Sequence, residues 1–426
     1  MRLILFDGPP GKRANFRPLS FSRPVWELRC GMSTLGERLI AKVRPSEVAC
    51  FVEPYMAAAY KTKTDRKVND LTALRGSDLL LVSGRVKADS LSAAATGPSE
   101  VAVDGDGNVL YARVAKGDLA KLPTDSLEGL LDAAKKAFAQ VAAPETWNYT
   151  WDLILANPEQ LTKDFAAAGR CGIEGTVEQP GAIRGSDKDV YVAPGALVHP
   201  MVVLDAAGGP IYIDADAEIH PFTRIEGPCY IGKKSILLGT KCRGGNTIGP
   251  ACRVGGEIEE SIIHGHSNKY HDGFLGHAYV GEWVNLGALT SNSDLKSDYT
   301  TVSVVLDGRA PIDTGSTKVG ALIGDHTKTS IGVLLNTGAY VGAMGLIMST
   351  GTVLPKFIPS FAWLLSGVVT KGFGKGKLYE TAKVAMSRRE VEWTAAEEAM
   401  WDAVFEMTAP VRDVAIKKGR RMMRKS

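Results

Sequence analysis

One histidine of this chain is a candidate for proton transfer. His271 lies in the segment KYHDGFLG, and His264, His266 and His277 crowd the same region. A neutral imidazole accepts a proton near pH 7, so a histidine held at a rigid edge can act as a general base, a role typically worth ~10²–10⁴-fold in rate. The alternative is that His271 is only a turn residue.

A second set of candidates follows the first apolar segment. The run LILFDG leads directly into PPGKRANFRPLSFSRP. Glycine-rich turns offer backbone N–H groups to phosphate oxygens, and basic side chains neutralise the phosphate charge. The residues that could form such a nucleotide-binding cradle are Gly8, Gly11, Lys12, Arg13, Arg17 and Arg23. The alternative is that these arginines brace Glu27 and acidic neighbours in a domain without nucleotide chemistry.

The cradle would be positioned by a small α/β domain spanning residues 1–145. The apolar runs LILF and Leu79–Gly84 are typical of short buried strands. Ser33–Val43 and Leu127–Ala143 have helical spacing, and Asp70–Leu74 has a helical or turn pattern.

Residues 146–188 are expected to form a helical connector. Trp151, Ile154 and Leu155 fall on one helical face, and Asn157-Pro158 predicts a break followed by a second helix. The aromatic residues indicate that this connector packs against a neighbour.

Aliphatic residues then recur every six positions between about Asp189 and Pro359. Examples are Ile213, Ile219, Ile225, Ile231 and Leu237. A period of six fits neither an α-helix nor an alternating strand, and it predicts a left-handed parallel β-helix of hexapeptide repeats at residues 189–362. Stacked coils would bury one aliphatic column, so that each coil depends on its neighbours. A β-sandwich with accidental spacing is the weaker alternative.

Two segments interrupt the period, and a distinct tail follows it. Leu204–Pro210 and Leu295–Ser316 are expected to leave the β-helix and form binding walls. Residues 363–426 are expected to form a helical basic tail, in which Thr381–Met407 has a long helical pattern. Val411–Ser426 carries seven Lys/Arg against one Asp. This run fits a solvated helix end, a subunit contact, or a site for an acidic or phosphate-bearing partner.

Composition restricts the classes of function. The chain has 426 residues, 45% of them hydrophobic and 23% charged, which predicts a globular protein of two or three domains. A formal net charge of +3 argues against nucleic acid as the main partner. The six cysteines include no C-x-x-C pair, which argues against a cysteine zinc cluster. No membrane span or signal peptide is evident, and we expect a cytoplasmic location.

Several motifs together resemble one family. The segment GGEIEESIIHGHSNKYHDGFLGHAYVGEWVNLGALTSNSDLK resembles the acetyltransferase half of the bifunctional N-acetylglucosamine-1-phosphate uridylyltransferase/glucosamine-1-phosphate acetyltransferase family. The whole chain is similar to a shorter bacterial branch of sugar nucleotidyltransferases, and the resemblance covers residues 1 to about 363. The motifs that carry it are Arg17–Gly31, Trp151–Leu153, Gly324–Thr329 and Pro355–Phe361.

This resemblance implies roles for particular residues. His271 would be the general base that takes a proton from the sugar amine as the amine attacks acetyl-CoA. Arg243 would bind the sugar phosphate, because a guanidinium suits that bidentate contact. Asn285, Asn292 and Lys269 would be further substrate-binding residues, although Asp294 matches the family position of Asn292 equally well. Each asparagine could instead be a turn residue.

The chain also departs from the family pattern. Glu259 stands where the family has a sugar-binding Lys, and Phe274 stands where it has a Tyr. The N-terminal G-x-G-T-R motif is missing. Ser83-Gly84-Arg85 replaces the segment with the magnesium-binding Asp, for which Asp7 or Asp89 could substitute. The N-terminal domain is also shorter than in the family. Because of these departures, the resemblance identifies neither the acceptor sugar nor the metal site.

The resemblance implies a bifunctional enzyme of sugar-nucleotide biosynthesis. Its N-terminal domain would join a sugar 1-phosphate to an NTP with Mg²⁺, and its β-helix would N-acetylate an amino sugar phosphate with acetyl-CoA. Family β-helix acyltransferases imply a homotrimer with sites between prisms. Two alternatives remain: an acyltransferase with a degenerate, nucleotide-binding or regulatory N-terminal domain, and a non-enzymatic trimeric scaffold.

Overall fold

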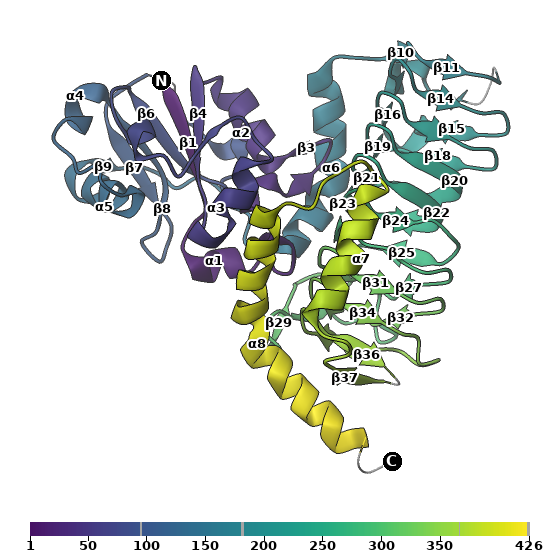
Figure 1. Ribbon diagram of the computed structural model, residues 1–426. Helices are drawn as coiled ribbons and strands as arrows, with labels where there is room; N and C mark the ends of the chain where they lie inside the picture. Colours follow the sequence, from purple (N-terminus) through teal and green to yellow (C-terminus); the bar gives the residue numbers. More distant parts are fainter. Residues whose placement is uncertain (94–95, 180–182, 366, 424–426) are drawn as a thin grey trace.

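The computed structural model describes residues 1–93, 96–179, 183–365 and 367–423. An α/β domain, purple to blue in Figure 1, stands beside a tall prism of short strands drawn teal to green. Two C-terminal helices, drawn in yellow-green and yellow, run along these parts. Among the described residues, no helix combines the length and the apolar character needed to cross a membrane.

The α/β domain is built on a seven-stranded sheet of order β5-β4-β1-β6-β8-β7-β9. Strand β1 pairs in parallel with β4 and β6, and β8 runs antiparallel to β6. The two apolar runs LILF and Leu79–Gly84 are confirmed as the buried central strands β1 and β6. The bounds are β1 (Arg2–Phe6), β4 (Glu47–Phe51), β5 (Lys67–Val68), β6 (Leu79–Ser83), β7 (Glu100–Val103), β8 (Val109–Val114) and β9 (Ala139–Gln140).

Short helices flank this sheet. A capping box of Thr34 and Glu37 starts α2, since each side chain accepts a hydrogen bond from a backbone N–H that the first helical turn leaves free. The second predicted helix ends at Ala137, earlier than expected, because Phe138 is extended and leads into β9. The bounds are α1 (Pro10–Ala14), α2 (Leu35–Val43), α3 (Pro54–Lys61), α4 (Lys116–Leu119) and α5 (Leu127–Ala137).

The repeat section forms the predicted β-helix, whose three faces are parallel ladders of two- to seven-residue strands. Strands β20 (Ile236–Cys242) and β22 (Arg253–Glu259) turn a corner and belong to both the second and the third face.

The first face contains β10 (Gly172–Ile173), β13 (Val190–Val192), β16 (Ile211–Ile213), β19 (Cys229–Ile231), β21 (Asn246–Ile248), β23 (Ile262–Gly265), β26 (Tyr279–Glu282), β30 (Leu322–Ile323), β33 (Tyr340–Val341) and β35 (Phe357–Ile358). The second contains β11 (Thr176–Val177), β14 (Leu197–Val198), β17 (Glu218–Ile219), β24 (Asn268–Lys269), β31 (Lys328–Thr329), β34 (Leu346–Ile347) and β36 (Trp363–Leu365). The third contains β12 (Ile183–Arg184), β15 (Val203–Asp205), β18 (Arg224–Glu226), β25 (Phe274–Gly276), β27 (Ser291–Asn292) and β32 (Leu334–Leu335).

The β-helix starts earlier than the predicted Asp189. Strands β10, β11 and β12 pair in parallel with the first strands of the predicted repeat. This first coil extends from Gly172 to Arg184, where its sequence lacks the regular aliphatic period. The predicted aliphatic column is confirmed, because Ile213, Ile219 and Ile225 have no exposed surface and belong to one core cluster.

The connector is one helix, α6 (Thr150–Ala168), and the predicted break at Pro158 is wrong. A proline inside a helix removes one N–H donor, a cost that packing can offset. The side chain of Asn157 is fully buried and bonds the backbone of Gly31 and of Gly245, which fixes the helix between the two domains. α6 contacts β19, β21 and β26 on the first face.

The longer interruption of the repeat is a hairpin of β28 (Ser303–Val305) and β29 (Pro311–Asp313). Val302 and Val304 are fully buried in a cluster with Phe16 of the N-terminal domain. The hairpin therefore joins the domains, and the binding wall that we expected here is not what it forms. The shorter interruption is a single 3-10 turn, Ala206–Gly208.

The tail forms two helices, α7 (Lys375–Ser387) and α8 (Ala395–Met423), where the sequence predicted one long helical pattern. α8 contacts α3 and β37 (Val368–Thr370), so it bridges the N-terminal domain and the end of the β-helix. In the basic run, Arg412 is buried with its guanidinium 3.8 Å from the ring centre of Phe405. Residues 424–426 of that run lie outside the described residues.

A buried ion pair links the α/β domain to the β-helix. Arg23 Nη2 lies 2.6 Å from Asp325 Oδ2 and 2.9 Å from Glu282 Oε2. Ser22 Oγ also donates to Asp325. Burial alone would lower the pKa of Arg23, but the two carboxylates outweigh it and raise that pKa. Arg23, one of the predicted nucleotide ligands, is therefore bound within the protein.

Replacing Arg23 by Ala should lower the free energy of unfolding by about 3–5 kcal/mol, because two carboxylates would remain buried without their cation. Urea unfolding followed by circular dichroism measures the loss. Arg309→Ala is the control, since Arg309 is exposed on the hairpin and its loss should cost less than about 0.5 kcal/mol. A loss below about 1 kcal/mol for Arg23→Ala, the range of exposed pairs, would contradict the assignment.

Candidate functional site

A cavity of about 510 Å³ lies at the edge between the second and third faces of the β-helix, with His271 and Asn285 in its lining. His271 lies in the exposed turn between β24 and β25. Its ring and that of Tyr270 pack edge to face, with their centroids 5.0 Å apart. Asn285 Oδ1 accepts a hydrogen bond from Asn268 Nδ2 at 3.2 Å. The structure thus brings two of the predicted site residues together.

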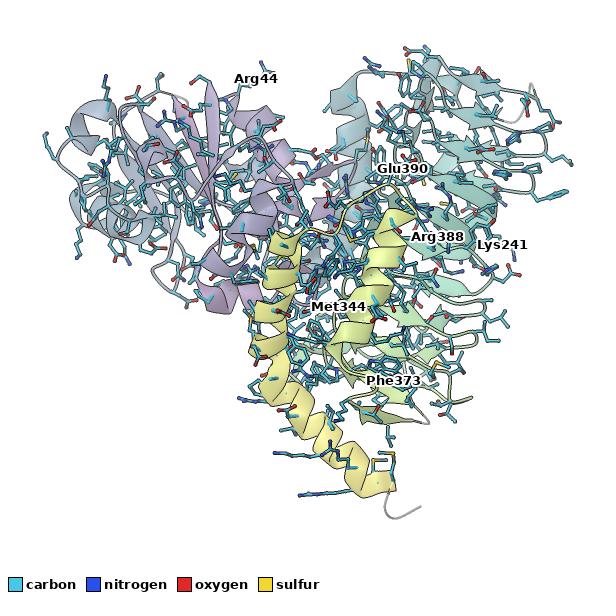
Figure 2. The ribbon with its side chains drawn as sticks, viewed as in Figure 1. Arg44, Lys241, Met344, Phe373, Arg388 and Glu390 are labelled. Atoms are coloured by element: carbon cyan, nitrogen blue, oxygen red, sulfur yellow. The ribbon has the colours of Figure 1, made fainter. Side chains whose placement is uncertain are left out.

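Three arginines also line this cavity. Arg253 comes from β22, and Arg388 and Arg389 follow the end of α7, where Figure 2 shows Arg388 beside the coils. Arg389 Nη2 donates to Asn268 Oδ1 at 3.0 Å. Burial lowers the pKa of Arg389, and the neighbouring charges of Arg253 and Arg388 lower it further.

No carboxylate balances these three cations. Within the described parts of the chain, none of the three arginines forms an ion pair, and no Asp or Glu lines the cavity. Three guanidinium groups that face one cavity without a counter-ion favour binding of a multiply charged anion such as a phosphate ester. The cavity therefore combines a possible general base with an anion-binding wall.

A second opening continues this site along the second face. Its lining includes Trp283 and Lys328 as well as Asn268, Asn285 and Arg389. Lys328 Nζ donates to the carbonyl of Trp283, and burial lowers the pKa of Lys328 to about 8. Asn268, Asn285 and Lys328 occupy equivalent positions in three successive coils.

Lys269, another predicted substrate ligand, points into the prism. Its Nζ donates to the carbonyl of Gly255 at 2.9 Å and to that of His271. Burial lowers its pKa to about 8. In this structure Lys269 is buried and supports the turn that carries His271, and its contact with a substrate stays a prediction.

Arg243 and Asn292 lie on another edge, between the third and first faces. Arg243 Nη1 pairs with Glu259 Oε2 at 2.9 Å. Asn292 is buried, and its amide accepts from the N–H of Gly276 and donates to the carbonyl of that residue. A single chain therefore does not bring these two residues to His271, and Asn292 serves to hold adjacent coils together.

Of the predicted nucleotide residues, Gly8 is the one that lines a cavity of about 770 Å³ in the described part of the chain. It lies where β1 and β4 end, the edge at which parallel sheets commonly bind ligands. Gly11 is exposed and has open space around it, and Lys12 Nζ pairs with Asp106 at 2.6 Å. Arg17 lies away, with its guanidinium over Phe21 and against Met407 of α8.

Arg13 is committed to a structural contact. Its Nε bonds Asp7 Oδ2 at 2.8 Å, and both side chains are buried. Burial raises the pKa of Asp7 to about 6, although the charge of Arg13 lowers it. Arg13 is therefore not placed to neutralise a nucleotide, and Asp7 does not offer a free carboxylate to a metal.

The segment that replaces the family's magnesium-binding Asp carries a cation. Arg85 is buried, and a Cβ built on Gly8 would lie 3.8 Å from Arg85 Nη1. Arg85 Nε donates to the carbonyl of Trp147 at 3.2 Å. A Mg²⁺ ion does not fit beside this guanidinium, so the family metal site is not reproduced at Ser83-Gly84-Arg85.

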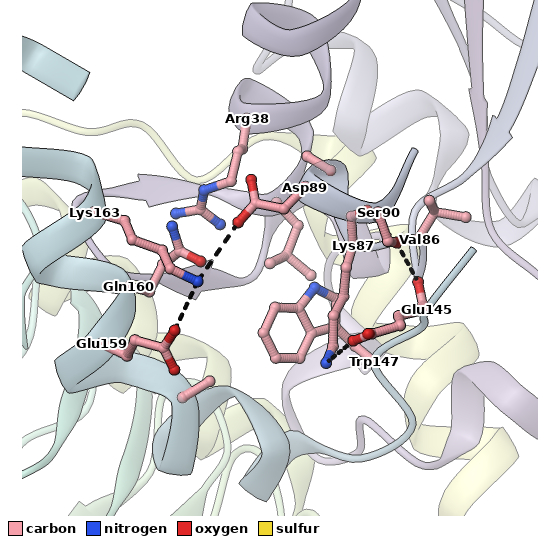
Figure 3. A pocket seen from close by; sticks show the side chains of 13 residues that line it. Arg38, Val86, Lys87, Asp89, Ser90, Glu145, Trp147, Glu159, Gln160 and Lys163 are labelled. Carbon is pink, nitrogen blue, oxygen red and sulfur yellow. Dashed lines mark hydrogen bonds and ion pairs between the residues drawn. The ribbon is translucent and has the colours of Figure 1, made fainter. Parts of the chain in front are cut away.

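Asp89, the other possible metal ligand, lies in a separate cavity of about 360 Å³ between the α/β domain and α6 (Figure 3). Its carboxylate lies 3.9 Å from Lys163 Nζ, which also pairs with Glu159 at 2.7 Å. Lys87 pairs with Glu145 at 2.9 Å. The charges shown in Figure 3 are thus largely balanced, unlike those around His271.

Comparison with known proteins finds similarity over part of this chain. A family model described as sugar nucleotidyl transferase matches residues 3–170. A bifunctional sugar-1-phosphate nucleotidylyltransferase/acetyltransferase of Sulfurisphaera tokodaii is 37% identical over 151 residues, which cover 33% of this chain and 35% of that protein. The chain is thus similar, over part of its length, to proteins of sugar-nucleotide chemistry.

Other curated relatives agree. The bifunctional protein GlmU of Anaplasma marginale is 28% identical over 176 residues, 40% of this chain and 39% of that protein. GlmU of Synechococcus elongatus is 26% identical over 207 residues, 47% of this chain and 42% of that protein. The chain thus spans less than half the length of these GlmU-type relatives, so its own substrates are a matter for proposal.

The motifs that carry the resemblance did not predict that three arginines would line the cavity of His271. Arg253 is one of many basic residues in the repeats, and Arg388 and Arg389 belong to the tail, which lay beyond the resemblance. In the sequence, Arg388 and Arg389 are an adjacent pair of arginines inside the predicted helical pattern Thr381–Met407.

A buried histidine near the Arg243 edge should make stability depend on pH. His277 Nδ1 lies 2.8 Å from Asp294 Oδ2 and its Nε2 lies 3.0 Å from Glu260 Oε2. Burial lowers the pKa of His277, but the two carboxylates outweigh it and raise that pKa to about 9.

Because the pKa is raised on folding, the charged imidazole stabilises the fold fully below its unfolded pKa of ~6.5, and this stabilisation is lost as pH rises through about 9. We expect the free energy of unfolding of wild type to exceed that of His277→Gln by roughly 3 kcal/mol at pH 6, and this difference should disappear by pH 10. Urea unfolding of both proteins across this range measures it. A gap that does not change with pH would contradict a charged His277.

Proposed function

We propose that the β-helix transfers an acetyl group from acetyl-CoA to the amine of an amino sugar phosphate, with His271 as the general base. The observation that carries this proposal is the position of His271 beside Arg253, Arg388 and Arg389, three cations that have no ion-pair partner among the described residues. Both substrates carry phosphate groups, which such a wall binds through charge-assisted hydrogen bonds.

The chemical step uses few groups. The neutral imidazole of His271 takes a proton from the amine as its nitrogen attacks the thioester carbonyl carbon. The carbon–sulfur bond then breaks, the sulfur leaves as CoA thiol after it gains a proton, and an amide remains. His271 is exposed, so it can reach a substrate bound at the coil edge.

We infer a homotrimer as the working assembly. The edge with His271 and the edge with Arg243 are separate in one chain, and a ring of three prisms could bring one edge of each chain against the other edge of its neighbour. Arg243 is half exposed, so a substrate held between two chains can reach it, in competition with its partners Glu257 and Glu259. In this arrangement Arg243 would bind the sugar phosphate.

For the N-terminal domain we propose nucleotidyl transfer from an NTP to a sugar 1-phosphate. The matched family domain and the cavity beside Gly8 support this. An oxygen of the sugar phosphate would attack the α-phosphorus of the nucleotide, and pyrophosphate would leave. Mg²⁺ usually assists this chemistry, but its site in this chain would have to differ from the family position that Arg85 fills.

A second candidate is an acyltransferase whose N-terminal domain binds a nucleotide or regulates without transferring it. The observation that favours it is the structural use of Arg13 and Arg23, two cations of the predicted cradle, and of Asp7, a possible metal ligand.

Replacing His271 by Ala should lower kcat for acetyl transfer by about 10²–10⁴-fold. Arg389→Ala should mainly raise KM, because it removes a contact made before the reaction begins. Release of CoA thiol from acetyl-CoA with a panel of amino sugar phosphates measures both. Lys233→Ala, in an exposed turn of another coil, is the control. Turnover that survives His271→Ala unchanged contradicts the assignment, and absence of turnover in wild type favours a scaffold.

Wild-type protein should release pyrophosphate when supplied with Mg²⁺, UTP or dTTP, and a suitable sugar 1-phosphate. A coupled phosphate assay across several sugars measures this, with boiled protein as the control. If no sugar supports release while a nucleotide still raises Tm, the second candidate is correct and the nucleotidyl transfer proposal fails.

A further inference from the structure

We propose that the second face of the β-helix holds a divalent transition-metal ion between His199, Glu218 and His220. These residues lie in the first coils, at β14 and β17, several coils away from the cavity of His271. No part of the proposed catalysis uses them.

The fold stacks these side chains in one column. Val177, Val198 and Ile219 are register partners in three successive coils. The residues that follow them, Glu178, His199 and His220, therefore occupy equivalent positions on the surface of the prism. Because the coils are rigid and continuous, this column is set by the backbone.

The distances suit one ion. Glu218 Oε1 lies 3.1 Å from His199 Nε2 and 3.1 Å from His220 Nε2. The ligand atoms of the three residues all lie within 4.8 Å of one another. Tetrahedral zinc with bonds of ~2.0–2.1 Å separates its ligand atoms by about 3.3 Å. Two of the three separations are close to this value, and the third is at most 4.8 Å.

The second ring nitrogen of His199 has the partner that a metal ligand needs. His199 Nδ1 lies 2.8 Å from Glu178 Oε2. Ligating histidines usually give their other N–H to a carboxylate, which fixes the tautomer and aims the free nitrogen at the metal. Glu178 therefore orients His199 so that its Nε2 faces Glu218.

The negative charges at this site and its exposure to solvent also suit a cation. In the part of the chain that the structure describes, Glu178 and Glu218 pair only with imidazoles, and no Lys or Arg neutralises either of them. The side chains of His199 and His220 are 24% and 35% exposed, so an ion can enter from solvent. Two imidazoles and one carboxylate form a donor set that suits Zn²⁺, with water in the fourth position.

The ion would act as a clip between coils. It would join side chains of two neighbouring coils, with a third supplying Glu178, near the end of a solenoid in which each coil is stabilised by the next. We therefore assign it a structural role.

The test is zinc titration of the full chain after chelator treatment, followed by isothermal calorimetry and by Tm. Wild type should bind one Zn²⁺ per chain with micromolar or tighter affinity, and zinc should raise Tm. His199→Ala and His220→Ala should abolish this binding. Glu178→Gln should weaken it by about 10–100-fold, as loss of an outer partner does.

The control is His271→Ala, which removes an exposed histidine outside the proposed zinc site and should retain zinc binding in full. Circular dichroism in the absence of metal shows whether each variant is folded. Absence of micromolar binding in wild type, or equal binding in the folded His199→Ala and His220→Ala variants, overturns the proposal. Neither result bears on acetyl or nucleotidyl transfer.

Discussion

The contact between Arg23 and the two carboxylates Asp325 and Glu282 fixes the position of the α/β domain on the β-helix. Removing three charged groups from water is costly, so such a cluster persists only with good geometry and satisfied hydrogen bonds. Its value is specificity, since few other arrangements of the two domains would pair all three groups. The hairpin at residues 303–313 and helix α6 then pack around this fixed point with apolar side chains.

The motifs that made the chain recognisable turn out to specify domain packing. The segment RPLSFSRP supplies Arg23, and GDHTKT supplies its partner Asp325. In the motif PKFIPSF, Phe361 packs against Phe405 of α8 at 5.1 Å between ring centres. In the motif WDL, Asp152 bonds the N–H of Tyr149 and so starts α6. Residues that hold two domains in one orientation thus coincide with the motifs that the sequence analysis singled out.

Local periodicity predicted the larger part of the fold. The six-residue spacing identified the β-helix, and with the resemblance it located His271 and Asn285 at one coil edge. Lys269 shows a limit of this reasoning, because position 269 is in register with Val254 and so faces the core. Only the backbone carbonyls at the turn make a lysine tolerable there, and no sequence pattern reports them. Arg388 and Arg389 reach the cavity by the return of α7 along the prism, a long-range contact that spacing does not encode.

Helix α8 has a consequence for how the two proposed sites relate. It contacts α3, whose first residue Pro54 lines the cavity beside Gly8, and it also contacts β37 at the end of the prism. It is joined to α7, which carries Arg388 and Arg389 to His271. If a ligand at the first cavity shifts α3, the position of both arginines changes with it. By thermodynamic reciprocity, any factor by which one ligand alters the affinity of the second must equal the factor in the opposite direction. Helix α8 would therefore couple ligand binding at the cavity beside Gly8 to ligand binding at the cavity of His271.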